Sequence, residues 1–397
     1  MPLIIIMLMA YMLLPIVGEI AIYSGMYDIP AGDVDLSLIL NNSFFVIIVI
    51  LTFIFISNLT KAKQTTTPQN IKRTIIRINI LLFIFMLFVF TAAGYKIYLL
   101  GMTTGQVRTS FGWYGFIYTW IAKYLTPTLL LFSALLYLNA EKEKKLQLFP
   151  LYILSWILTL LIAVFTGYKS NIVTLLLPAI SILIFNKKFP IKLFIIIPLF
   201  LVLIIFMTTL IKGYSFNTAY YFILHRMTVM TAFGTVGVWN YYPDGASLNE
   251  SILLSYGLFG TNIASVLSGY DVNSIQFLGT NLSKLITYKA YPDSYSALTG
   301  EVNVTVTNFG EAWYMLNVLY PIYAIIAGAI SGFTIFKLKK SLTNGNYCWA
   351  ACIMTYFYIV ILPWFNSGNI FHLVSAPSLF WLVGTFFLLK VIYQGRF

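Results

Sequence analysis

Charged residues are scarce in this sequence. They make up 9% of the 397 residues, whereas 60% are hydrophobic and the mean hydropathy is +0.87. Soluble domains carry about a quarter charged residues. The scarcity therefore excludes a soluble globular protein, and the long apolar runs must be judged against a lipid bilayer.

Residues that commonly bind metals are also few. The chain has two cysteines, Cys348 and Cys352, and two histidines, His225 and His372. The cysteines lie four residues apart in an apolar run, so they share a helix face and are expected to be small packing residues. Without paired histidines or a Cys/His set, the sequence predicts no metal site and no cofactor. GxxxxGK[ST] and GxSxG patterns are absent, which leaves a nucleotide-driven motor or a serine nucleophile elbow unsupported.

Apolar runs long enough to cross a bilayer recur along the chain. About twenty apolar residues form one membrane span. The sequence predicts an all-α, polytopic membrane protein with ten spans, and up to twelve if the long polar region hides more. The ten expected spans are 2–23, 36–57, 78–100, 114–138, 148–165, 171–186, 191–211, 313–336, 347–364 and 374–393.

The runs divide the chain into three parts. Residues 1–211 hold seven expected spans, 212–312 form one large polar region, and 313–397 hold three spans. Within the polar region, 217–240 and 252–268 are the stretches where short or re-entrant helices are expected.

Basic residues are unevenly distributed between the turns. The chain has 24 basic and 12 acidic residues, a formal net charge of +12. Sixteen of the basic residues fall on one side of the expected spans, the pattern of cytoplasmic turns. That explanation is simpler than a basic surface for nucleic acid, so we expect no nucleic-acid partner. Both termini are then cytoplasmic, and 212–312 faces outward, which in a bacterium with two membranes is the periplasm. The sixteen are Lys61, Lys63, Lys72, Arg73, Arg77, Lys142, Lys144, Lys145, Lys187, Lys188, Lys192, Lys337, Lys339, Lys340, Lys390 and Arg396.

Three cations on the expected outer side are candidates for anion binding. Arg108, Lys169 and Arg226 each lie in a turn rich in glycine and aromatic residues. Topology selects against cations there, so those that remain indicate a function. They would suit a lipid-linked diphosphate, whose oxygens pair well with guanidinium groups. The alternative is that they reach to the phosphates of the outer leaflet.

Aromatic residues of the polar region form a second group of candidates. Tyr241, Tyr242 and Trp313, together with His225, offer flat faces and polar tips that suit sugar rings. An aromatic belt at the membrane surface is the alternative explanation.

A general base for a sugar hydroxyl must be a carboxylate or a histidine within reach. The candidates are Asp293, Glu301, Glu311 and His372. Each of them alone is more often structural.

At this point the chain resembles the O-antigen and capsular oligosaccharide repeat-unit polymerases, the Wzy-type proteins. The many-span plan with one large outer region is similar. So are the turn FTGYKSN before an apolar span, the ten residues that separate Arg226 from Gly237, and the stretch FGEAWYMLNVLYPIYAIIAGAISG.

The resemblance implies an inverting, metal-independent glycosyl transfer at the periplasmic face of the inner membrane. A glycan on undecaprenyl diphosphate would move onto an incoming undecaprenyl-diphosphate repeat unit, and a chain-length regulator protein would be a partner besides the bilayer. Arg226, Lys169 and Arg108 would neutralise the leaving diphosphate. Glu311, which opens a span, is the favoured base.

Three other classes stay open. An O-antigen ligase-type transferase would use the same cations on the same lipid. A flippase or transporter of lipid-linked oligosaccharide would show ionisable residues in mid-span, where Glu19 is the main example. A purely structural membrane protein would have no need of the three outer cations.

Overall fold

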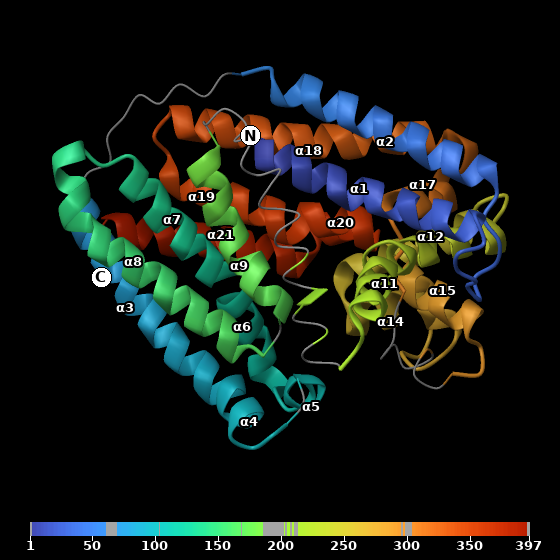
Figure 1. The fold of residues 1–397 in the computed structure, drawn as a ribbon, viewed down its shortest axis with the longest axis horizontal. Helices are drawn as coiled ribbons and strands as arrows, with labels where there is room; N and C mark the ends of the chain where they lie inside the picture. Colours follow the sequence, from blue (N-terminus) through green and yellow to red (C-terminus); the bar gives the residue numbers. More distant parts are fainter. Residues whose placement is uncertain are drawn as a thin grey trace.

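The computed structural model describes residues 2–60, 70–102, 104–167, 169–185, 213–294 and 304–394, together with residues 202, 205, 206, 209 and 297. These residues form helices and turns, with no strand among them (Figure 1). The expected all-α class is confirmed.

Eight helical stretches in the described parts of the chain are long and apolar enough to cross a membrane. They match eight of the ten expected spans. The expected span 171–186 is the shorter apolar helix α9, Lys169–Ile184, and most of 191–211 lies outside the described residues. The eight are Leu3–Tyr23, Leu36–Ser57, Ile71–Tyr98, Gly115–Leu138, Lys142–Phe165, Asn308–Thr343, Tyr347–Ser367 and Ile370–Gln394.

Several of these stretches are built from shorter helices. Three contain a π-helical turn, a form that holds one extra residue and recurs at functional sites. In the first half of the chain the elements are α1 (Pro2–Tyr23), α2 (Leu36–Ser57), α3 (Ile71–Val89), π-helix η1 (Phe90–Gly94), α4 (Tyr95–Tyr98), α5 (Thr104–Thr109), α6 (Gly115–Thr119), π-helix η3 (Trp120–Leu125), α7 (Thr126–Leu138) and α8 (Lys142–Phe165).

The polar region folds into short helices. They are α11 (Phe216–Met227), α12 (Val229–Tyr241), α13 (Leu248–Tyr256), the 3-10 turn η4 (Gly257–Phe259), α14 (Thr261–Ser268), the 3-10 turn η5 (Gln276–Thr280) and α15 (Leu282–Ala290). Helix α12 packs against α1. Both stretches in which short helices were expected are therefore helical.

The last part begins earlier than 313. Helix α17 (Asn308–Leu316) starts at Asn308 because the Thr307 hydroxyl accepts the N–H of Gly310 at 3.4 Å and caps the helix. It ends at Asn317, whose φ of 47° breaks the helix before α18 (Tyr320–Thr343). The remaining elements are α19 (Tyr347–Tyr356), π-helix η7 (Phe357–Ile361), α20 (Leu362–Ser367), the 3-10 turn η8 (Ile370–Val374) and α21 (Ala376–Gln394).

Helices α2 and α18 lie side by side in unusually close contact (Figure 1). A Cβ atom on Gly328 would fall 2.6 Å from the carbonyl oxygen of Val49. Gly332, four residues on, also faces α2. This is the small-xxx-small arrangement by which membrane helices approach closely.

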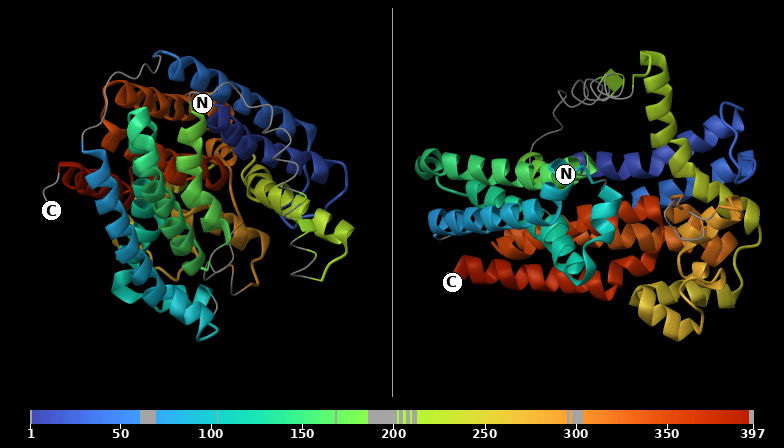
Figure 2. Two further views of the ribbon diagram at one scale, coloured as in Figure 1. Left: turned by 60° about the vertical axis from the view of Figure 1, so that its left-hand side comes forward. Right: turned by 90° about the horizontal axis from the view of Figure 1, so that it is seen from below.

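The interior of the bundle is aromatic and aliphatic, with Trp364, Phe357 and Phe132 fully buried. Its outside is also apolar, as Phe55 on α2 (70% exposed) illustrates. Such a surface is what lipid requires of a spanning protein. The short helices of 213–294 gather at one end of the long helices, and the C-terminus lies at the other (Figures 1 and 2). We call the first the loop end.

Candidate functional site

Two adjoining cavities lie at the loop end. The larger cavity has a volume of about 430 Å³ and the smaller about 230 Å³. Gly257, Gly260 and His372 line both, so the imidazole stands where the cavities meet. Ligand sites are typically concave spaces of this order.

The wall of the larger cavity comes from membrane helices and from the loop end. Two π-helical turns contribute to its wall, η3 through Lys123 and Tyr124, and η7 through Ile359 and Val360. The wall combines polar side chains with aliphatic and aromatic ones. The other lining residues are Leu258, Pro363, Trp364, Ser367, Ser375, Pro377, Ser378 and Trp381.

The smaller cavity brings several polar side chains together. Helix α15, capped by Asn281 through the N–H of Lys284 at 3.2 Å, presents Lys284 to it. Asn273 and Asn369 also line it. Amides, hydroxyls and one ammonium group are the chemistry that holds sugar hydroxyls or phosphate oxygens. The further lining residues are Thr261, Ala264, Val272, Phe277, Leu278 and Thr280.

A tight turn carries His372 to the junction. Gly368 and Asn369 both have positive φ, 60° and 67°, a conformation that only glycine and asparagine adopt at low cost. The turn continues into η8, whose Leu373 carbonyl accepts the hydroxyl of Tyr356. Ser375 donates to the carbonyl of His372 at 3.2 Å. The His372 backbone is thus fixed, while its side chain is exposed.

Glu311 holds the same turn in place through a hydrogen bond to its backbone. Its side chain is fully buried, and one oxygen accepts the N–H of Ile370 at 2.7 Å. The other accepts the hydroxyl of Tyr323 and the indole N–H of Trp364, the latter at 3.3 Å. Glu311 lines neither cavity. These contacts give it a positioning role, and its predicted role as the base stays a prediction.

The three predicted phosphate-binding cations do not line the cavities. Arg226 is exposed in the last turn of α11, with its guanidinium carbon 5.5 Å from the centre of the Phe222 ring. Arg108 belongs to α5 and Lys169 begins α9, but their side chains lie outside the described part of the structure. A Cβ on Gly167 would lie 3.0 Å from Thr104, so the segments that carry Arg108 and Lys169 are neighbours.

The predicted sugar-contacting aromatics form a packed cluster. Trp313 donates its indole N–H to the carbonyl of Tyr242 at 3.1 Å, and the Lys289 ammonium lies 4.1 Å from the Tyr242 ring centre. Burial, and secondarily the charge of Glu250, raises the pKa of Tyr242 to about 12. Tyr241 donates to the carbonyl of Pro30 at 3.2 Å. None of these aromatics lines either cavity.

The remaining candidates are dispersed. The His225 ring lies 5.1 Å from that of Tyr27, and burial followed by the charge of Arg226 lowers the pKa of His225. Asp293 is exposed in a turn after α15. Glu301 lies outside the described residues.

Among the described residues there is no group of three or more His, Cys, Asp or Glu arranged to hold a metal. Asp33 and Asp35 have an Asp-x-Asp spacing, but Asp35 caps α2 by accepting the N–H of Leu38 at 2.8 Å.

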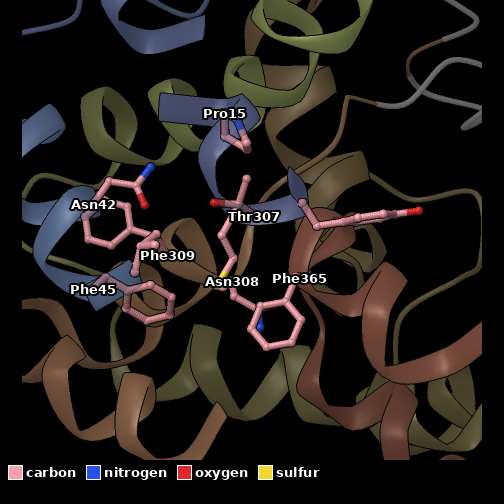
Figure 3. Close-up of a pocket in the computed structure, with 10 residues that line it drawn as sticks. Pro15, Asn42, Phe45, Thr307, Asn308, Phe309 and Phe365 are labelled. Carbon is pink, nitrogen blue, oxygen red and sulfur yellow. The ribbon is translucent and has the colours of Figure 1, made fainter. Parts of the chain in front are cut away.

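A third, very small cavity lies between α1, α2, α17 and α20 (Figure 3). Its volume of about 10 Å³ is close to what one water molecule needs. Asn42 lines it and donates to Glu19 at 2.6 Å. Asn308 also lines it, and its buried amide has no hydrogen-bond partner within the described structure. A bound water would satisfy both the oxygen and the nitrogen of this amide.

No pattern in the sequence predicts Tyr124, Ser378 or Trp381 as site residues, because only tertiary packing brings them to the cavity that His372 lines. Comparison of the chain with protein-family models, curated proteins and solved structures finds no match.

Proposed function

We propose that this protein is a membrane glycosyltransferase of the repeat-unit polymerase type, acting on undecaprenyl-diphosphate-linked oligosaccharides at the periplasmic face of the inner membrane. The observation that carries the proposal is the pair of cavities that meet at His372. Lys123 lines one cavity beside the apolar Ile359 and Val360, and Lys284 lines the other beside Asn273 and Asn369. The first set of side chains suits a lipid-linked diphosphate, and the second suits a sugar acceptor.

In this proposal the donor occupies the larger cavity, with its isoprenoid chain towards Ile359 and Val360 and its diphosphate near Lys123. The acceptor sugar occupies the smaller cavity beside Asn273 and Lys284. His372 is then the base within reach of both, in preference to the buried Glu311.

The reaction is a single displacement. The acceptor hydroxyl oxygen bonds to the anomeric carbon of the donor glycan as the bond from that carbon to the diphosphate oxygen breaks. The hydroxyl proton passes to the imidazole of His372. The diphosphate leaves with the electron pair, and Lys123 stabilises its charge. Arg226, Arg108 and Lys169 remain candidates for the same task.

A clean deletion of the gene, followed by gel analysis of the cell's lipopolysaccharide, tests the proposal. Loss of a polymerase leaves core carrying one repeat unit. Bare core would identify a ligase instead. Unchanged long chains would reject both transferases.

The purified protein provides a second test. We expect it to polymerise lipid-linked repeats in excess EDTA, because the proposed groups are all side chains. Full loss of activity that Mg²⁺ or Mn²⁺ restores would contradict this mechanism.

A further inference from the structure

Helix α14 has its polarity reversed relative to a helix on a soluble protein. Ile263, Val266 and Leu267 recur at i, i+3 and i+4 and so form one stripe. The stripe faces outward, with Ile263 54% and Val266 82% exposed. A surface helix normally turns such a stripe towards the core.

The side of α14 opposite the stripe carries Ala264, which is buried against the protein, and three partly or fully exposed hydroxyl residues. Thr261, Ser265 and Ser268 fall within an arc of about 60° at 100° per residue, opposite the apolar stripe. Thr261 lines the smaller cavity, as does the buried Ala264. Ser265 donates to the carbonyl of Tyr270 at 2.6 Å. The helix therefore contacts the protein on the side of Ala264, and within the described part of the chain its apolar stripe stays uncovered.

The position of α14 indicates what covers that stripe. Helix α14 contacts η4, η4 contacts η8, and η8 leads directly into the membrane helix α21. Exposed apolar residues continue across this junction, from Phe259 through Val374 to Phe380. The right-hand view of Figure 2 shows the gold helices of the loop end next to the end of the red helix α21.

Composition favours lipid over a protein partner. The eight residues of α14, TNIASVLS, include no charged residue. The stripe is continuous with the surface of α21 that faces lipid, and a helix with a strong apolar face beside a bilayer lies in its interface.

We propose that α14 is an interfacial helix whose Ile263, Val266 and Leu267 are inserted among the lipid chains of the leaflet at the loop end. The inference does not depend on the proposed glycan chemistry. It means that part of the region between residues 213 and 294 is immersed in the membrane surface.

A fluorescent probe on the stripe tests this. Val266→Cys is labelled with an environment-sensitive dye in a chain that also carries Cys348→Ala and Cys352→Ala. The protein is placed, one copy per disc, in lipid nanodiscs that contain lipids spin-labelled near the top of the acyl chain. We expect emission at shorter wavelength than the dye shows in water, and a loss of intensity that depends on the spin-labelled lipid.

Two further positions complete the test. Leu267→Cys should behave like Val266→Cys, and it replaces that variant in the test if Val266→Cys folds poorly. Asp271→Cys, an exposed position three residues after α14, is the control and should show water-like emission. Water-like emission at both stripe positions would overturn the proposal. Short-wavelength emission without quenching by the spin-labelled lipid would also overturn it, because protein would then cover the stripe.

Discussion

The carboxylate of Glu311 accepts the backbone N–H of Ile370 at 2.7 Å, across 59 residues of sequence. This bond joins α17 to the turn that precedes η8. Because His372 lies two residues beyond Ile370, the buried carboxylate determines where the imidazole stands between the two cavities. The side chain that resembled a base in the sequence therefore acts in the structure as the support of another candidate base.

Replacing Glu311 should destabilise the protein in a graded way. Glu311→Leu leaves three buried donors unpaired, each costing about 1–3 kcal/mol, whereas Glu311→Gln retains one acceptor. Tyr323→Phe removes a single donor and should cost about 1 kcal/mol. Thermal unfolding, followed by tryptophan fluorescence, measures these losses of stability. We expect the largest loss for Glu311→Leu, a smaller one for Glu311→Gln and the smallest for Tyr323→Phe. Equal stability of Glu311→Gln and the wild type would show that Glu311 has no positioning role.

His372→Gln should lower the rate of glycan transfer about 10²- to 10⁴-fold, the usual contribution of a general base. The melting temperature should stay close to that of the wild type, since the His372 side chain is exposed. Rates are measured with lipid-linked repeat units, and Lys142→Met at the other end of the bundle is the control. Near-normal polymer length at matched expression would exclude His372 as the base.

Gly328→Val should separate α2 from α18. The new side chain would begin 2.6 Å from the Val49 carbonyl oxygen, so the backbones must move apart at a cost of about 1–3 kcal/mol or more. Ala329→Val adds similar bulk at the neighbouring, half-buried position and is the matched control. Unfolding temperatures in detergent compare the two, and equal values would mean that this close approach contributes nothing.

Lys339→Met should cost about 1–2 kcal/mol, because Lys339 donates to the carbonyl of Ser57 and to Asn58 at the C-terminus of α2. Lys340 is exposed, and Lys340→Met removes the same charge without that contact. Its effect should stay within about 0.5 kcal/mol. If both variants lose the same stability, the effect belongs to net charge and not to the helix cap.

The charge of Arg226 should be detectable in the titration of the neighbouring His225. It contributes to the lowered pKa of His225, so Arg226→Gln should raise that pKa part of the way back towards about 6.5. The unfolded chain binds a proton there more readily than the folded protein. Stability due to His225 therefore decreases as the pH falls through the ordinary histidine range and levels off below the lowered pKa.

Labelled histidine makes the measurement simple, because the chain has two histidines. A carbon-13 titration of the protein in detergent follows both rings, and His372→Gln assigns the two signals. An unchanged His225 titration in Arg226→Gln would show that burial alone lowers the pKa.

The membrane spans could be predicted from the sequence because a continuous run of about twenty apolar residues is characteristic of a helix that crosses a bilayer. The break at Asn317 could not, since asparagine is common in ordinary turns and positive φ has no unique signature. Glu311 was expected at the start of the span 313–336. Instead, the Thr307 cap starts α17 at Asn308, and packing buries the Glu311 carboxylate. The larger cavity at His372 depends on residues from four separated segments, 123–124, 257–260, 359–367 and 372–381, which no local pattern joins.

The π-helical turns η3 and η7 have a consequence for how this protein can change over generations. Deleting one residue within Trp120–Leu125 would restore a regular α-helix and leave the two halves of that span in their present orientation, because the π-helical turn already accommodates one extra residue. The side chains of the turn itself, Lys123 among them, would change position while the flanking helical turns kept their contacts. Single-residue insertions and deletions in these two turns can thus exchange the side chains that line the larger cavity, a route to a changed cavity wall that needs no substitution at all.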